Sequence, residues 1–219
     1  HSEETLIQLN ETYEILKEKA IQLAKTLSDK RKKTAEQFTK KVKYELQFLN
    51  MPGIEFQVEQ ERVPLNSNGC DKIQFLISVN PGEPAKPIAK IASGGELSRI
   101  MLAIQTVLSA HDDLDTMIFD EVDTGISGSA AQKVGLKLHE VSRYAQVICI
   151  THLAQIACLA DYHLLIQKQV TENKTYTQVI PLSKEAQIKE IARMIGGQAI
   201  TPLLLQNAQE MIDSAKQLK

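Results

Sequence analysis

The first fifty residues follow a helical pattern of apolar positions and contain neither proline nor glycine. Apolar side chains recur at alternating intervals of three and four residues, with charged residues between them. The positions are Leu6, Leu9, Tyr13, Leu16, Ala20, Leu23 and Leu27. This spacing predicts a long helix and favours a coiled-coil seam over a helix packed on a globular body. A coiled-coil segment this short has only marginal stability by itself, so the helix requires a partner helix.

The apolar stripe becomes irregular at Lys30 and resumes loosely over residues 38–49. Met51-Pro52-Gly53 then ends the helix, because proline lacks an amide donor and glycine disfavours helical backbone. We therefore divide the chain into a coiled-coil arm stub over residues 1–50 and a globular lobe over residues 51–219.

The start of the lobe alternates between apolar and polar residues, as half-buried strands do. Residues 54–59 and 73–79 show this alternation, and Asn66-Ser67-Asn68-Gly69 supplies turn residues between them. Residues 80–87 contain three prolines and are expected to form a loop.

The rest of the lobe alternates between amphipathic segments and short, continuously apolar runs. The sequence predicts helices over 95–110, 129–143, 183–195 and 202–217, and a short helix that begins at Ala154. Buried strands are expected over 116–119 and 146–150. A hairpin is expected to pair 162–170 with 175–180 and to turn at Asn173-Lys174. Buried strands that alternate with helices indicate an α/β fold with a mostly parallel sheet flanked by helices.

The composition restricts the cellular environment of the protein but does not identify a binding partner. The formal charge is −2, and no apolar run approaches the roughly 18 residues that a membrane span needs. The three cysteines, Cys70, Cys149 and Cys158, have no metal-ligand spacing, which is typical of a reduced, cytoplasmic protein. The chain begins with His1 rather than Met, so we expect a fragment whose missing segments lie upstream.

A glycine-rich turn is expected to open the helix over 95–110. Adjacent Gly94 and Gly95 allow backbone N–H groups to approach an anion, and Ser93 adds a hydroxyl donor. A plain turn capped by Ser93 would explain the three residues alone. The longer string Ser93-Gly94-Gly95-Glu96-Leu97-Ser98-Arg99 favours an anion site.

Two buried strands each end in polar residues. Asp120 and Glu121 follow the first strand, and Thr151 and His152 follow the second. The carboxyl ends of parallel strands form one edge of a sheet, where ligands bind. One acid can hold Mg²⁺ and the other can polarise water, although each pair alone also fits ordinary solvent-exposed residues.

Together these segments resemble known motifs. S-G-G-E-L-S-R at 93–99 is similar to the signature motif of ABC-type ATPases, T-M-I-F-D-E-V-D-T-G at 116–125 to a Walker B strand, and I-T-H-L-A-Q-I-A at 150–157 to the switch-histidine segment. A coiled-coil stub that leads into such a lobe resembles the SMC-like ATPases. Within them the motifs most resemble a bacterial family of DNA double-strand break repair and recombination.

The resemblance implies a role for each matching residue. Ser93, Gly94 and Gly95 would contact the γ-phosphate of an ATP held by the opposite head, and Glu96 and Arg99 would help to shape that ATP-binding surface. Asp120 would hold Mg²⁺, Glu121 would be the catalytic base, and His152 would sense the γ-phosphate. Ser127 stands where many relatives have an aspartate, so no role is assigned to it.

The resemblance also implies partners. The sequence has no GxxxxGK[ST] loop, which binds the β- and γ-phosphates in such enzymes. We therefore expect ATP hydrolysis only with the amino-terminal half of the same head, in an ATP-dependent homodimer of heads. DNA is the other expected partner, and no membrane is expected.

Basic residues gather near the end of the predicted helix. Residues 25–43 contain eight basic residues and two acidic ones. A solvated helix face explains this composition, and a contact with the DNA backbone is the functional alternative. The lysines proposed for that contact are Lys32, Lys33, Lys40 and Lys41.

Two other functions are compatible with parts of the pattern. A nucleotide-binding subunit of a transporter would share the three motifs, but the coil stub disfavours it. A non-catalytic coiled-coil interaction module would explain the helix, but polar motifs at the strand ends argue against it.

Overall fold

The computed structural model describes residues 2–80, 82–90, 94–111, 113–171, 174–197 and 199–218. The chain forms two compact units. The first consists of His1–Tyr44 and Met51–Ile91, and the second of Glu45–Asn50 and Ala92–Lys219. The sequence placed a boundary at residue 50, whereas the structure groups most of the long helix with the hairpin that follows it.

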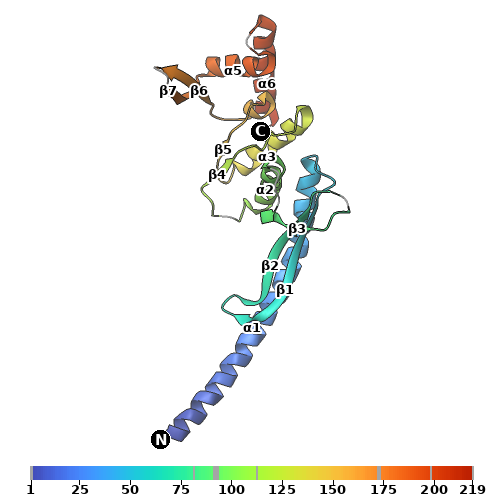
Figure 1. The fold of residues 1–219 in the computed structure, drawn as a ribbon, viewed down its shortest axis with the longest axis vertical. Coiled ribbons are helices and arrows are strands. Elements are labelled where there is room, and N and C mark those ends of the chain that lie inside the picture. The colour runs from blue at the N-terminus through green and yellow to red at the C-terminus, as the bar shows by residue number, and fades with distance from the viewer. Residues whose placement is uncertain are drawn as a thin grey trace. The chain divides into compact units, whose positions relative to one another are not determined.

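Helix α1 (Ser2–Phe48) has 47 residues and confirms the predicted long helix (Figure 1). Its apolar stripe is open to solvent, since Leu6, Leu16 and Leu23 are 65%, 59% and 62% exposed. An exposed stripe of this length is available to a partner helix, as a coiled-coil seam requires.

An antiparallel hairpin lies along the later part of α1 (Figure 1). Its strands are β1 (Glu55–Asn66) and β2 (Gly69–Ser78). The Ser28 hydroxyl donates to Asp71 Oδ1 at 2.8 Å, and Arg31 Nη1 donates to the Asn68 carbonyl at 2.9 Å. The hairpin therefore covers α1 from about the point where the exposed stripe becomes irregular.

Three phenylalanines form the apolar contact between α1 and the hairpin. Phe38 of α1 lies 5.7 Å from Phe56 and 5.6 Å from Phe75 between ring centroids. Phe56 is fully buried. Contact among the three rings stabilises the first unit, because aromatic pairs contribute beyond the area that they bury.

The hairpin is longer than the sequence predicted. Backbone pairing continues past the alternating residues as far as the pair Arg62 and Asp71, and Asn66 pairs with Gly69 at the turn. Part of the predicted proline-rich loop also joins this sheet, because β3 (Lys86–Pro87) pairs with β2. A 3₁₀ turn (Ile88–Lys90) follows.

The second unit contains a parallel pair of strands, β4 (Thr116–Phe119) and β5 (Gln146–Cys149). Helices α2 (Gly94–Leu108) and α3 (Gly128–Val141) lie close to their predicted positions. Together with the long helix, these elements confirm the α/β class. Among the described residues the parallel sheet has two strands, and the other two sheets are antiparallel.

The parallel pair is buried on one face, whereas the sequence predicted burial on both. Met117 and Phe119 are 7% and 6% exposed, but Ile118 and Ile148 are 69% and 42% exposed. Successive side chains of a strand point to opposite faces, so the apolar residues of the second face meet no covering layer in the described part of the chain.

The remaining elements form a hairpin and a helical cluster. They are α4 (Ala154–Ala157), β6 (Leu164–Thr171), β7 (Lys174–Pro181), α5 (Lys184–Gly196) and α6 (Pro202–Leu218). The predicted turn residue Asn173 lies outside the described residues. Ile191, Ala208 and Ile212 pack in one buried cluster, which also includes the buried Cys158. No described helix carries an apolar segment long enough to cross a membrane.

The last turn of α1 belongs to the second unit and is joined to α3 by buried charges. Lys137 Nζ lies 2.6 Å from Glu45 Oε2 and 2.8 Å from Glu140 Oε2. The same ammonium group lies 4.8 Å from the centre of the Phe48 ring. Burial lowers the pKa of Lys137, but hydrogen bonds to Glu140 and Glu45 outweigh it and raise the pKa above its usual value.

Candidate nucleotide site

The loop after β4 presents two carboxylates at the carboxyl end of the sheet. Asp120 and Glu121 are both exposed. The backbone N–H of Glu121 donates to Asp120 Oδ1 at 2.8 Å, which orients the Asp120 side chain. Glu121 has a φ of +57°, a left-handed conformation that costs energy in residues other than glycine. Backbone strain of this kind is concentrated at functional sites.

The glycine turn at the start of α2 packs against this loop. A Cβ atom at Gly95 would lie 2.8 Å from Thr124 Cβ and 3.1 Å from the Glu121 carbonyl oxygen. A Cβ atom at Gly94 would collide with the Glu121 carboxylate. Backbone atoms surround Gly95, so only glycine allows the turn to approach the loop so closely there, whereas at Gly94 the Glu121 side chain could move aside.

Two further residues of α2 fix the helix to the loop. The Ser98 hydroxyl donates to the Asp120 carbonyl at 2.7 Å. Arg99, which is 7% exposed, donates from Nη1 to the carbonyls of Val122 and Thr124 at 3.2 and 2.7 Å. Burial lowers the pKa of Arg99, although the nearby Glu96 and Asp123 oppose this effect. These bonds hold the glycine turn beside the two acids.

The loop after β4 also contacts the end of β5. Asp123 is 4% exposed. Its Oδ2 atom accepts from the Thr151 hydroxyl at 2.6 Å and from the His152 backbone N–H at 2.9 Å. His152 Nδ1 lies 2.9 Å from the same oxygen, and the His152 side chain is 73% exposed. The two strand ends are thus joined through one buried carboxylate.

Negative charge dominates this edge of the sheet. Cys149, the last residue of β5, is half-buried, and its thiol has a pKa raised to about 12 by burial and by the charges of Asp123 and Asp120. This thiol stays protonated at neutral pH, so it is a poor nucleophile and metal ligand.

The acids at this edge could supply some, but not all, of the ligands of a magnesium ion. No described cluster of three or more acidic, histidine or cysteine side chains could hold a metal ion. Mg²⁺ is often bound by one or two carboxylates, with water and phosphate oxygens as its other ligands. Asp120 and Glu121 match that kind of site, so the residues fit a magnesium ion that arrives with a phosphate ligand.

The structure brings most of the predicted site residues together. Gly94 meets Glu121, whose backbone N–H bonds to Asp120, and His152 is bound to Asp123, two residues further along the same loop. Ser93 lies outside the described residues. Glu96 is half-buried in the first turn of α2, and Ser127 precedes α3 without forming a side-chain cap. The lysines Lys32, Lys33, Lys40 and Lys41 are exposed on α1, in the first unit.

Sequence reasoning missed the part played by Asp123. The residue stands two positions after Glu121, and the sequence alone gave it no role. Its position between two strand ends depends on the parallel pairing of β4 and β5, which places Phe119 opposite Cys149. The polar pair Thr151-His152 was the available signal, since a buried acid at the neighbouring strand end would satisfy both residues.

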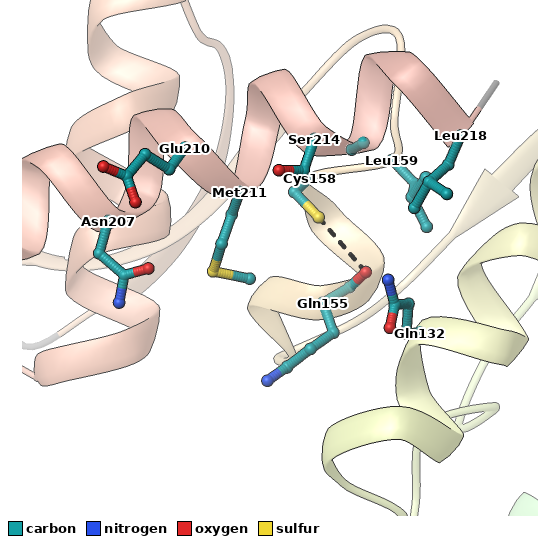
Figure 2. Close-up of a pocket in the computed structure, with 10 residues that line it drawn as sticks. Gln132, Gln155, Cys158, Leu159, Asn207, Glu210, Met211, Ser214 and Leu218 are labelled. Carbon is teal, nitrogen blue, oxygen red and sulfur yellow. Dashed lines mark hydrogen bonds between the residues drawn. The ribbon is translucent and has the colours of Figure 1, made fainter.

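A separate pocket of about 310 Å³ lies among α3, α4 and α6 (Figure 2). Gln132, Gln155 and Asn207 bring amide groups to it, and Met211 and Leu159 bring apolar surface. Cys158 Sγ donates to the Gln155 carbonyl at 3.4 Å, as the dashed line in Figure 2 shows. None of the predicted site residues lines this pocket.

Comparison with solved structures defines the class of fold. A Smc head domain with a coiled coil and joint from Pyrococcus yayanosii matches with a TM-score of 0.54, over 85% of this chain and 35% of that chain, at 23% identity. A Smc head with an extended coiled coil from Pyrococcus furiosus, bound to the C-terminal domain of ScpA, matches with a TM-score of 0.57, over 88% and 46%, at 19% identity. The chain has the α/β fold of an SMC-type head with its coiled-coil helix.

In sequence, the chain is similar to the DNA repair protein RecN. The protein of Halalkalibacterium halodurans is 40% identical over 100% of this chain and 40% of its own length. That of Bacillus subtilis is 49% identical over 74% and 28%, and that of Vibrio cholerae 39% identical over 98% and 39%. No family profile matches. These relatives confirm the resemblance read from the motifs, and the chain spans at most about two fifths of their length.

Proposed function

We propose that this chain forms part of an SMC-like ATPase head that acts in the repair and recombination of broken DNA. The similarity to RecN supports the biological role, and the SMC-type fold supports the head. The observation that carries the proposal is the contact of the Gly94-Gly95 turn with Glu121, at the strand end that Asp123 joins to His152.

In this proposal each side chain has a distinct task. Asp120 holds Mg²⁺, which neutralises phosphate charge when bound. Glu121 accepts a proton from the attacking water, because a free carboxylate at the strand end can act as a general base. His152 contacts the terminal phosphate through its exposed ring.

The glycine turn, with Ser93, Gly94 and Gly95, meets the γ-phosphate of an ATP held by a second head, and Glu96 helps to shape that surface. Backbone N–H groups at the start of a helix favour anions. Because the Glu121 carboxylate covers Gly94 in this structure, a phosphate at the turn requires that carboxylate to swing away. ATP would thereby join two heads, and hydrolysis would release them.

The site requires a further polypeptide segment, which we propose to be the amino-terminal half of the same head. The sequence contains no GxxxxGK[ST] loop for the β- and γ-phosphates. In addition, Ile118 and Ile148 expose an apolar sheet face that a further layer would bury. Both features indicate that the chain carries only some of the walls of a nucleotide pocket.

Reconstitution tests this proposal. We expect this chain alone to release no phosphate from ATP above the buffer rate. Joined to a segment that carries the phosphate loop, it should hydrolyse ATP with Mg²⁺ at a rate on the order of that of ordinary enzymes, about 1 per second or more. Phosphate release is measured for the chain, the segment and their combination. Brisk hydrolysis by the chain alone, or none by the combination, would contradict the proposal.

The exposed lysines of α1 are the second element of the proposal. Lys32, Lys33, Lys40 and Lys41 are solvent-accessible on α1, which contacts the hairpin through Ser28 and Arg31. We propose that these lysines contact the DNA backbone. Such contacts are independent of sequence and weaken steeply with salt.

Charge reversal tests the DNA contact. Replacement of Lys32, Lys33 and Lys41 by Glu should reduce the salt dependence of duplex binding by about one ion per lysine and weaken affinity for all sequences alike. Fluorescence anisotropy of the assembled head at several salt concentrations measures both quantities. The control reverses Lys184, Lys189 and Lys216, which are exposed in the second unit and give the same change in net charge. Equal effects of the two triple variants would exclude the α1 contact.

A further inference from the structure

Asp123 is a buried acid at the candidate site with no assigned task. It is 4% exposed, yet it lies only three positions beyond the proposed magnesium ligand Asp120. A buried carboxylate is costly unless its oxygens are paired, so its partners indicate what it does. Those partners belong to the Thr151-His152 segment.

The geometry determines which atom of His152 carries a proton. Asp123 Oδ2 already accepts from the Thr151 hydroxyl and from the His152 backbone N–H. The same oxygen lies 2.9 Å from His152 Nδ1, so Nδ1 is the donor in this contact. The opposite ring nitrogen, Nε2, is then left for another partner, and the ring is 73% exposed.

We propose that Asp123 is a positioning residue that fixes the ring orientation and the tautomer of His152, so that Nε2 is presented to the terminal phosphate of ATP. This inference rests on the proposed function. The contact with the backbone N–H positions the residue, and the contact with Nδ1 orients the ring. An orienting carboxylate is the usual way in which a protein selects the functional nitrogen of a histidine.

A purely structural task for Asp123 would be to hold the two strand ends together. The Thr151 contact serves that purpose, and the Thr151 hydroxyl also accepts from the Leu153 backbone N–H at 3.1 Å. The two tasks are separable. Thr151→Val removes a loop bond and leaves the ring contact, whereas Asp123→Ala removes both, and Asp123→Asn retains an acceptor oxygen.

The first experiment reads the tautomer directly in this chain, without nucleotide. Long-range ¹H–¹⁵N correlation spectra of histidine-labelled protein are recorded at a pH where the ring is neutral, with His152→Gln to assign the signal. We expect the proton on Nδ1 in the wild type and in Thr151→Val, a shift to Nε2 in Asp123→Ala, and recovery of Nδ1 in Asp123→Asn. A proton on Nε2 in the wild type overturns the inference, whatever the Asp123 variants show.

The second experiment measures turnover by the chain joined to a phosphate-loop segment. Asp123→Ala should lower kcat about tenfold or more, as loss of an orienting partner does, with KM nearly unchanged. Asp123→Asn should regain most of that loss, and Thr151→Val should lose little. Full activity in Asp123→Ala, where Glu121→Gln is inactive, overturns the inference alone. Full activity in Glu121→Gln overturns the proposed function, while the tautomer result stands on its own.

Discussion

Glu121→Gln should abolish ATP turnover by the assembled head while ATP still holds two heads together. The amide has the size and shape of the carboxylate but cannot accept a proton from water, and general-base catalysis contributes about 10²- to 10⁴-fold. We therefore expect kcat to fall by that order, with dimers that persist instead of dissociating. Phosphate release measures the first effect, and light scattering after size-exclusion chromatography with ATP and Mg²⁺ measures the second.

The matched control is Glu185→Gln, which makes the same change at an exposed position in the first turn of α5. Its turnover should equal that of the wild type. If Glu121→Gln hydrolysed ATP at the wild-type rate, the site would not work as proposed, because Glu121 would not be the proton acceptor.

Lys137→Met should have the largest effect on stability, with a loss of about 3 kcal/mol in the free energy of unfolding of the second unit. Methionine keeps most of the aliphatic volume but leaves Glu45, whose side chain is 12% exposed, buried without its cation. Removal of one partner of a buried pair is far more costly than loss of an exposed pair. Urea unfolding followed by circular dichroism measures the difference.

Lys216→Met is the control, because its pair with Asp213 is exposed on both sides, at 64% and 52%. Such pairs contribute at most about 1 kcal/mol. Equal losses in the two variants would show that burial of the Lys137–Glu45 pair adds no stability beyond that of an exposed pair. The Lys137 contribution should also depend on pH. Its pKa is raised above 10.5, so the contribution is complete below that pH and is lost as the pH rises through the higher folded-state value.

The sequence predicted the strand ends of the site well, because short apolar runs and the polar residues after them are local features. β4 has the predicted bounds, and β5 ends one residue early. The task of Asp123 was not predictable in this way. Its contact with His152 spans 29 positions and exists only because two parallel strands lie side by side. The same holds for Arg99, whose charge gave no sign that it would be buried against two carbonyls.

Burial was the other point that sequence alone could not settle. Continuous apolar runs predicted strands covered on both faces, but Ile118 is 69% exposed. An apolar residue is suited to burial in the complete protein, where a segment outside this chain can cover it. In the hairpin of the first unit the sequence underestimated the length of the strands. Polar positions such as Glu61 continue the strand, because backbone pairing does not depend on which side chains alternate.

Helix α3 begins three residues after Gly125, which has a φ of +74° in the loop beyond Asp120 and Glu121. Lys137 lies nine residues further along α3, about 13 Å along the axis at 1.5 Å per residue, and forms an ion pair with Glu45 in the last turn of α1. Lys133, also on α3, donates from Nζ to Asn50 Oδ1 at 2.7 Å. Helix α3 therefore connects the end of this loop to the last turn of α1 and the residues that follow it. A displacement of the first turn of α3 would therefore reach residues 45–50 through contacts made by a single helix.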